Sequence, residues 1–149
     1  SSISLNTGSV QAIITFYDFG SAGKDKKDNI IGTYSFSDMV MPQIEYMSNG
    51  NLVAFGDHEI VLFNDSSEPK RKKEIFPQGS IDSIFFNEDN FGYIGPETND
   101  KGETVKKMYV YSMSGWKKLD KEITGSYTTV YMLENDDVVL STDKTAEIQ

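Results

Sequence analysis

Apolar residues in this chain gather in short runs that polar turn residues separate. Residues 43–64, QIEYMSNGNLVAFGDHEIVLFN, show the pattern most clearly. Three short runs rich in β-branched and aromatic residues alternate there with two polar tetrads, which predicts three strands joined by two tight turns. Asn49-Gly50 in the first tetrad supplies the positive φ values that a tight hairpin requires. We therefore expect antiparallel hairpins in this part of the chain.

The same pattern returns twice downstream. Residues 82–94 (DSIFFNEDNFGYI) and 129–141 (TVYMLENDDVVLS) align without gaps with residues 43–55 (QIEYMSNGNLVAF). In each segment two apolar residues precede a polar four-residue turn, and a second apolar run follows it. Recurrence at intervals of roughly 40 residues predicts a repeated supersecondary unit. The second copy carries extra residues at 95–103, which we expect to lengthen its hairpin loop, because loops tolerate insertions better than strands.

Other runs complete the copies. Val10 to Phe19 reads as a third strand that resembles residues 61–65, and further runs read as outer strands at 30–36, 70–76 and 116–123. No stretch has a convincing helical period, since β-branched residues and a central Asn-Asp-Asp argue against a helix at 130–140. About 13 strands result, in the pattern of four-stranded units. The copies span residues 10–36 (partial), 39–76, 80–123 and 126–149 (partial).

Four antiparallel strands in every such copy resemble the blades of a β-propeller. From Val10 onward the chain resembles WD40-like and quinoprotein-like propellers broadly, although the Gly-His and Trp-Asp dipeptides of WD40 repeats are absent. It is also similar to uncharacterised propeller-like domains of bacterial cell-envelope proteins. The resemblance implies an all-β fold of antiparallel four-stranded blades. Residues 1–149 would form one propeller-like domain or fragment, an incomplete or partial propeller of about three to four blades.

Composition narrows the classes of partner. A net charge of −9 argues against nucleic acid, because phosphate binding needs a basic face. Cysteine is absent, so no disulfide framework or thiolate site is expected. No apolar run approaches the roughly 20 residues that span a bilayer, which predicts no membrane insertion by this segment. The chain begins at Ser1 without Met, and we expect a truncated or processed start.

The basic residues are lysines apart from Arg71, and Asn, Asp and Ile are plentiful. This bias is typical of proteins from AT-rich bacterial genomes. Together with the resemblance, it predicts an extracytoplasmic or cell-envelope location, with the cytoplasm as the alternative.

Candidate chemistry is sparse. His58 is the single histidine and lies in a turn between two acids, where a solvated side chain is expected. We predict no catalytic residues and no cofactor site. Acidic turns at 87–90, 99–103 and 134–137 offer oxygen ligands suited to calcium, but their spacing matches no calcium loop, so we interpret them as Asx-rich hairpin turns and predict no metal site.

Two groups of residues have alternative interpretations. Residues 70–73 form either a basic docking patch or a solvated outer strand, and the flanking acids favour the second. Trp116 and the tyrosines either line a carbohydrate or peptide platform or fill the space between blades, and we favour packing. If a platform exists, its candidate residues are His58, Trp116, Tyr109 and Tyr111.

The sequence thus predicts a non-catalytic module of a bacterial envelope protein that binds a protein or a small ligand such as a glycan. The alternative is a fragment of a propeller-type glycosidase or lyase whose catalytic residues lie partly outside this chain. A purely structural role is a third option. The partial copies at either end also predict open strand edges, and hence self-association into a homo-oligomer.

Overall fold

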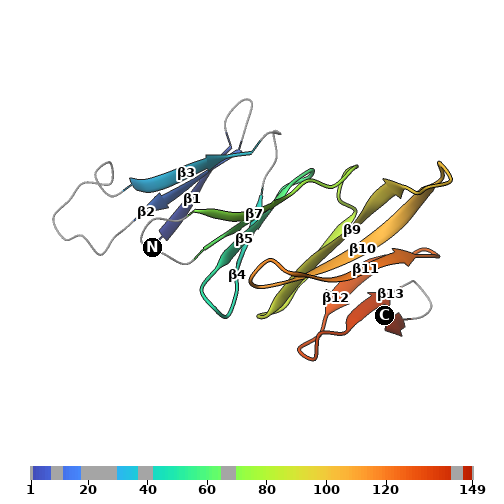
Figure 1. The fold of residues 1–149 in the computed structure, drawn as a ribbon. Helices are drawn as coiled ribbons and strands as arrows, with labels where there is room; N and C mark the ends of the chain where they lie inside the picture. The colour runs from blue at the N-terminus through green and yellow to red at the C-terminus, as the bar shows by residue number, and fades with distance from the viewer. Residues whose placement is uncertain are drawn as a thin grey trace. The chain divides into compact units, whose positions relative to one another are not determined.

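The computed structural model describes residues 2–7, 12–17, 30–36, 42–64, 70–141 and 146–148. These residues form 14 strands and no helix, and neighbouring strands pair antiparallel in four sheets (Figure 1). The predicted all-β class is therefore confirmed. Within this part of the chain, no helix has the length and hydrophobicity of a membrane-spanning segment.

The first of two compact units comprises residues 1–45 and 52–75 and contains two sheets. In the three-stranded sheet the order is β1-β2-β3, with bounds β1 (Ser2–Thr7), β2 (Ala12–Tyr17) and β3 (Ile30–Ser35). In the four-stranded sheet the order is β4-β5-β6-β7, with bounds β4 (Gln43–Tyr46), β5 (Leu52–Phe55), β6 (Ile60–Phe63) and β7 (Arg71–Ile75). The uncharged strands β5 and β6 are buried along their whole length, whereas the charged edge strand β7 is largely exposed.

One hydrophobic core joins the two sheets of this unit. Its members alternate along the strands, so that each sheet turns one face toward the other. They are Ile14, Phe16, Tyr34, Phe36, Leu52, Ala54, Val61 and Phe63, with Ile44 packed against them. This packing brings β2 and β3 close to β6, which is the relationship that creates the candidate site below.

The second unit comprises residues 46–51 and 76–149. Its four-stranded sheet has the order β11-β10-β9-β8, with bounds β8 (Ser83–Phe86), β9 (Asn90–Thr98), β10 (Thr104–Ser112) and β11 (Lys117–Ile123). Its three-stranded sheet has the order β12-β13-β14, with bounds β12 (Thr129–Met132), β13 (Val138–Ser141) and β14 (Ala146–Ile148). The first strands of the two sheets, β8 and β12, contact each other. Their shared core contains Phe85, Ile94, Met108, Val110, Ile123, Val138 and Leu140.

A β-bulge recurs at the same place in three sheets. In each of these sheets the register shifts once between the last two strands. The shift lies between Phe16 and Tyr17 in β2–β3, between Leu62 and Phe63 in β6–β7, and between Val110 and Tyr111 in β10–β11. A bulge bends the strand and increases its twist locally. The three sheets therefore share a structural detail that the sequence alignment did not reveal.

The extra residues 95–103 do lengthen the hairpin of the second copy, as predicted, but mainly through its strands rather than through its loop. Strands β9 and β10 continue pairing as far as Thr98 opposite Thr104, so only the short segment between them turns. Gly95 and Pro96 resemble turn residues in sequence. Pro96, however, lies beyond Ile94, the last residue of β9 that pairs with β8, so that one side of the strand is an edge where a missing N–H is tolerated.

The predicted strands of the two complete copies agree closely with the structure, whereas the first copy, predicted to begin at residue 10, is preceded by the paired strand β1. The two complete copies appear as four-stranded antiparallel sheets over 43–75 and 83–123, and the predicted turns 48–51, 56–59, 87–90 and 134–137 all separate strands. The predicted strand ends at 10–11 and 18–19 lie outside the described residues. None of the described sheets closes on itself, and the propeller arrangement stays a prediction.

Candidate functional site

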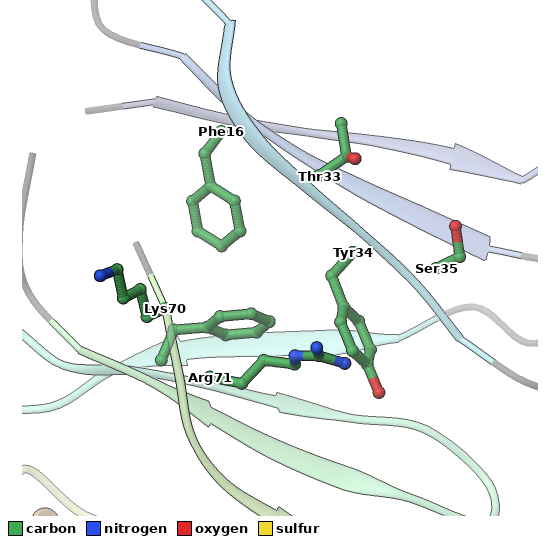
Figure 2. Close-up of a pocket in the computed structure, with 7 residues that line it drawn as sticks. Phe16, Thr33, Tyr34, Ser35, Lys70 and Arg71 are labelled. Carbon is green, nitrogen blue, oxygen red and sulfur yellow. The ribbon is translucent and has the colours of Figure 1, made fainter. Parts of the chain in front are cut away.

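A pocket of about 510 Å³ opens in the first unit where the two sheets meet (Figure 2). Its volume lies within the range typical of small-molecule sites. The lining residues come from β2, β3, β6 and the start of β7, and they are Phe16, Thr33, Tyr34, Ser35, Phe63, Lys70 and Arg71. Segments distant in sequence therefore build one concave surface.

Alternation along β3 decides which of its side chains face the core. Thr33 and Ser35 are exposed, whereas Tyr34 between them is buried, as the two-residue period of a strand requires. Tyr34 therefore points toward Phe63 and Arg71, and the Thr33 and Ser35 side chains point to the opposite face of the strand. Figure 2 shows these three side chains along a single strand.

The floor of the pocket is aromatic. The ring of Phe63 lies edge-to-face with Phe16 at a centroid distance of 5.0 Å and with Tyr34 at 5.6 Å. The rings are nearly covered, at 4% exposure for Phe16, 2% for Phe63 and 9% for Tyr34. The floor is therefore rigid core, and the accessible part of the pocket is mainly polar.

A buried carboxylate anchors the tyrosine. Tyr34 donates its hydroxyl hydrogen to Glu59 Oε2 at 2.7 Å, and Glu59 is only 2% exposed. Burial raises the pKa of Tyr34 above its ordinary value, and the hydrogen bond to Glu59 raises that pKa further. The hydroxyl therefore stays protonated at neutral pH and holds the ring in a fixed position.

Arg71 lies against this fixed ring. Its guanidinium carbon is 5.4 Å from the centroid of Tyr34, a cation–π distance, and its Nη1 forms an ion pair with Glu74 Oε1 at 3.1 Å. Figure 2 shows Arg71 extending toward Tyr34, while Lys70 extends away from it. The arginine is thus positioned from two sides.

Lys70 is fixed through its backbone. Its N–H donates to Asn64 Oδ1 at 2.7 Å, and its carbonyl oxygen accepts from the N–H of Asn64 at 3.1 Å. This pair of bonds joins the end of β6 to the start of β7. It therefore places two consecutive cationic side chains at the pocket rim.

The chemistry of this arrangement suits an anion. The two cations at its rim can donate hydrogen bonds to a carboxylate or phosphate. Among the described residues no group of three or more His, Cys, Asp or Glu side chains is arranged to hold a metal ion. Binding through hydrogen bonds and charge is what the pocket residues themselves can supply.

The whole chain, residues 1–149, matches the model of a family described as "Family of unknown function (DUF5711)". The chain belongs to the DUF5711 family. No curated protein matches it significantly. The pocket described above is therefore a candidate site for a member of a family whose function is unknown.

In this DUF5711 chain the four candidate platform residues differ in their exposure to solvent. His58 is exposed in the turn between β5 and β6, as expected. Tyr111 is only 6% exposed and stacks on Phe91 at 5.5 Å, so it is a packing residue. Tyr109 is half-buried and donates its hydroxyl hydrogen to Glu97.

Trp116 contradicts the favoured packing interpretation. Its side chain is 76% exposed, in the turn between β10 and β11. The turn is fixed by Ser112, whose Oγ accepts from the N–H of Trp116 at 3.1 Å. A short turn displays the indole outward, and the neighbouring sequence carried no signal for this exposure.

The acidic turns of this DUF5711 chain are Asx turns, as predicted. Asn87 Oδ1 accepts from the N–H of Asp89 and of Asn90, Asn99 Oδ1 from the N–H of Lys101, and Asn135 Oδ1 from the N–H of Asp137. These side-chain oxygens satisfy the turn backbone. These oxygens therefore act within their own turns.

Sequence reasoning found one part of the pocket and missed the rest. The sequence allows a basic patch at residues 70–73 but favours a solvated outer strand there, and in the structure Lys70 and Arg71 line the pocket. For Thr33, Tyr34 and Ser35 the sequence predicts only an outer strand. Their polar-aromatic-polar alternation was the available signal, but it gave no indication of which segment they would face.

Proposed function

We propose that this chain is a non-catalytic binding module of propeller-like blades in a bacterial envelope protein, and that the cationic pocket of its first unit binds a small ligand. The observation that carries the proposal is the placement of Lys70 and Arg71 on an aromatic floor. A positively charged concavity is unexpected in a chain with a net charge of −9.

The blade arrangement is supported by features that recur between copies. In three of the sheets the last two strands pair with one bulge. In the second unit the first strands of the two sheets, β8 and β12, lie in contact, as the inner strands of adjacent blades do. Each unit also buries a core between two antiparallel sheets. Stacking of neighbouring blades buries a core in the same way.

A thermal-shift screen with diverse small molecules tests the proposal. A ligand at 100 times its dissociation constant stabilises the folded state by about 2.7 kcal/mol. Arg71→Trp places a bulky ring where Arg71 extends into the pocket and should abolish the shift, whereas Thr129→Trp, at an exposed position of β12, should retain it.

The same ligands are then incubated with the protein and analysed for products. Binding that depends on the pocket, without turnover, supports the proposal. Turnover of a bound molecule, or a shift that Arg71→Trp leaves intact, would overturn it.

A further inference from the structure

We infer that the pocket of the first unit takes a polar organic anion of monosaccharide size, such as a uronic acid or a sugar phosphate, with Arg71 as its principal anion-binding residue. This inference rests on the proposed function and specifies its ligand. The shared chemistry is a carboxylate or phosphate joined to a polar body.

Arg71 is the only arginine of the chain and is placed for this task. A guanidinium has five N–H donors in a planar fork, which matches carboxylate and phosphate geometry. The ion pair with Glu74 engages Nη1, and the cation–π contact holds the guanidinium over the Tyr34 ring. The side chain remains 57% exposed, so the fork is accessible to a ligand.

Its support is buried and rigid. The Tyr34 hydroxyl is bonded to the buried Glu59, and the Tyr34 ring packs at 5.2 Å against Phe36, which is fully buried. A cation held on such a platform loses little conformational entropy when an anion binds. The arrangement therefore pre-organises Arg71 before any ligand arrives.

The pocket itself defines the rest of the ligand. Its volume of about 510 Å³ leaves room for a body of monosaccharide size beside the anionic group. The aromatic floor exposes little surface, so a large apolar ligand would gain little from it. Lys70 extends in the opposite direction from Arg71 and contributes a second, more distant positive charge (Figure 2).

Glu74 competes with the ligand. Its carboxylate occupies part of the arginine fork, so a ligand anion must replace or share this contact. Removing the Glu74 charge should therefore tighten binding. This expected gain separates the proposal from a general loss of structure.

Isothermal titration calorimetry with galacturonate, glucose 6-phosphate, galactose and inorganic phosphate tests the inference. The two charged sugars should bind and galactose should not, and the tighter of the two identifies the anionic group. Arg71→Gln should weaken binding about tenfold or more, because it removes a charged hydrogen bond. Glu74→Gln should strengthen it, and Lys70→Gln should weaken it less than Arg71→Gln does.

Matched controls carry the same charge changes elsewhere in the first unit. Lys72→Gln, on the same strand as Arg71, and Asp57→Asn, in the exposed turn before β6, should leave the dissociation constants unchanged. Equal binding of galactose, equally tight binding of inorganic phosphate, or no effect of Arg71→Gln would overturn the inference. If the screen instead finds a pocket-dependent neutral or cationic ligand, the proposed function stands and the anion class falls.

Discussion

Ser48 donates its hydroxyl hydrogen to Asp89 Oδ1 at 2.7 Å across 41 positions of sequence. Asn87 makes the equivalent contact one copy later, donating from Nδ2 to Asp136 Oδ1 at 2.9 Å across 49 positions. In both cases the first residue of one hairpin turn binds the third residue of the next turn. The hairpin turns of the second unit are thus joined in series by a repeated contact.

We predict that Asp136 stabilises this series of turns. Its Oδ1 accepts from Asn87 at 2.9 Å and from Asn90 at 2.5 Å, and its φ of 72° is a left-handed value that glycine adopts without strain. Asp136→Gly should therefore remove the hydrogen bonds while suiting the backbone, and lower the free energy of unfolding by about 1–2 kcal/mol. Urea denaturation measures this change.

The control is Asp100→Gly, in the exposed turn between β9 and β10, which should have a smaller effect. If the two variants unfolded at the same urea concentration, the contacts of Asp136 would not contribute to stability.

We also predict that the Tyr34 hydroxyl stabilises the first unit. Tyr34→Phe retains the ring and deprives the buried carboxylate of Glu59 of a donor, which should cost about 1–3 kcal/mol. Equilibrium unfolding measures the loss. Tyr131→Phe, at an exposed position of β12, is the control and should change stability little. Equal stability of Tyr34→Phe and the wild type would show that Glu59 needs no donor from Tyr34.

Local features of the fold were predictable from sequence. Asn49-Gly50 marks a hairpin because few other residues accept positive φ, and Gly50 indeed has a φ of 88°. The uncharged runs at 52–55 and 60–63 likewise predict buried strands. Both signals are local, because each depends on only a few consecutive residues.

Non-local features were not predictable in the same way. The pocket joins Phe16, Tyr34 and Arg71, whose meeting depends on how two sheets pack. The long pairing of β9 with β10 was missed because Gly95 and Pro96 look like turn residues, and only the end of β8 makes them acceptable in a strand. The sequence pattern of a strand shows which of its residues share a face, but it does not show which other strand or sheet packs against that face.

Acid should weaken the second unit through two carboxylates. A hydrogen bond from Lys107 at 2.5 Å lowers the pKa of Asp120, and hydrogen bonds from Asn87 and Asn90 lower that of Asp136. A depressed pKa in the folded state stabilises the fold above the unfolded value of about 4, and this stability is lost as the pH falls through the folded value. Both side chains are partly exposed, so we expect a modest effect that salt reduces.

The test compares Asp120→Asn with the wild type over a range of pH. At neutral pH the variant should be less stable, and the difference should shrink as the pH falls below the unfolded value of about 4 and through the lowered pKa of Asp120 in the folded state. Asp100→Asn, in an exposed turn, is the control. A difference that stayed constant with pH would show that the Asp120 charge is not the cause.

Gly92 is predicted to be the glycine least able to accept a side chain. It lies in β9 between Phe85 of β8 and Val110 of β10. A Cβ at this position would lie 2.5 Å from Cε2 of Phe85 and closer still to the carbonyl oxygen of Tyr109, so both sheet neighbours would have to shift. Overpacking of a core costs typically 1–3 kcal/mol, and we expect Gly92→Ala to lose about 3 kcal/mol or more because one contact is with backbone.

Gly95→Ala is the matched control on the same strand. Its nearest neighbour would be the Ser80 carbonyl oxygen at 3.6 Å, an ordinary contact, and the loss of glycine from the unfolded chain should stabilise the protein by about 0.5 kcal/mol. Thermal unfolding of the two variants decides between them. Because both changes add one methyl group to β9, a difference between them measures the close approach at Gly92. Equal melting temperatures would mean that β9 and β8 do not pack as closely there as the structure shows.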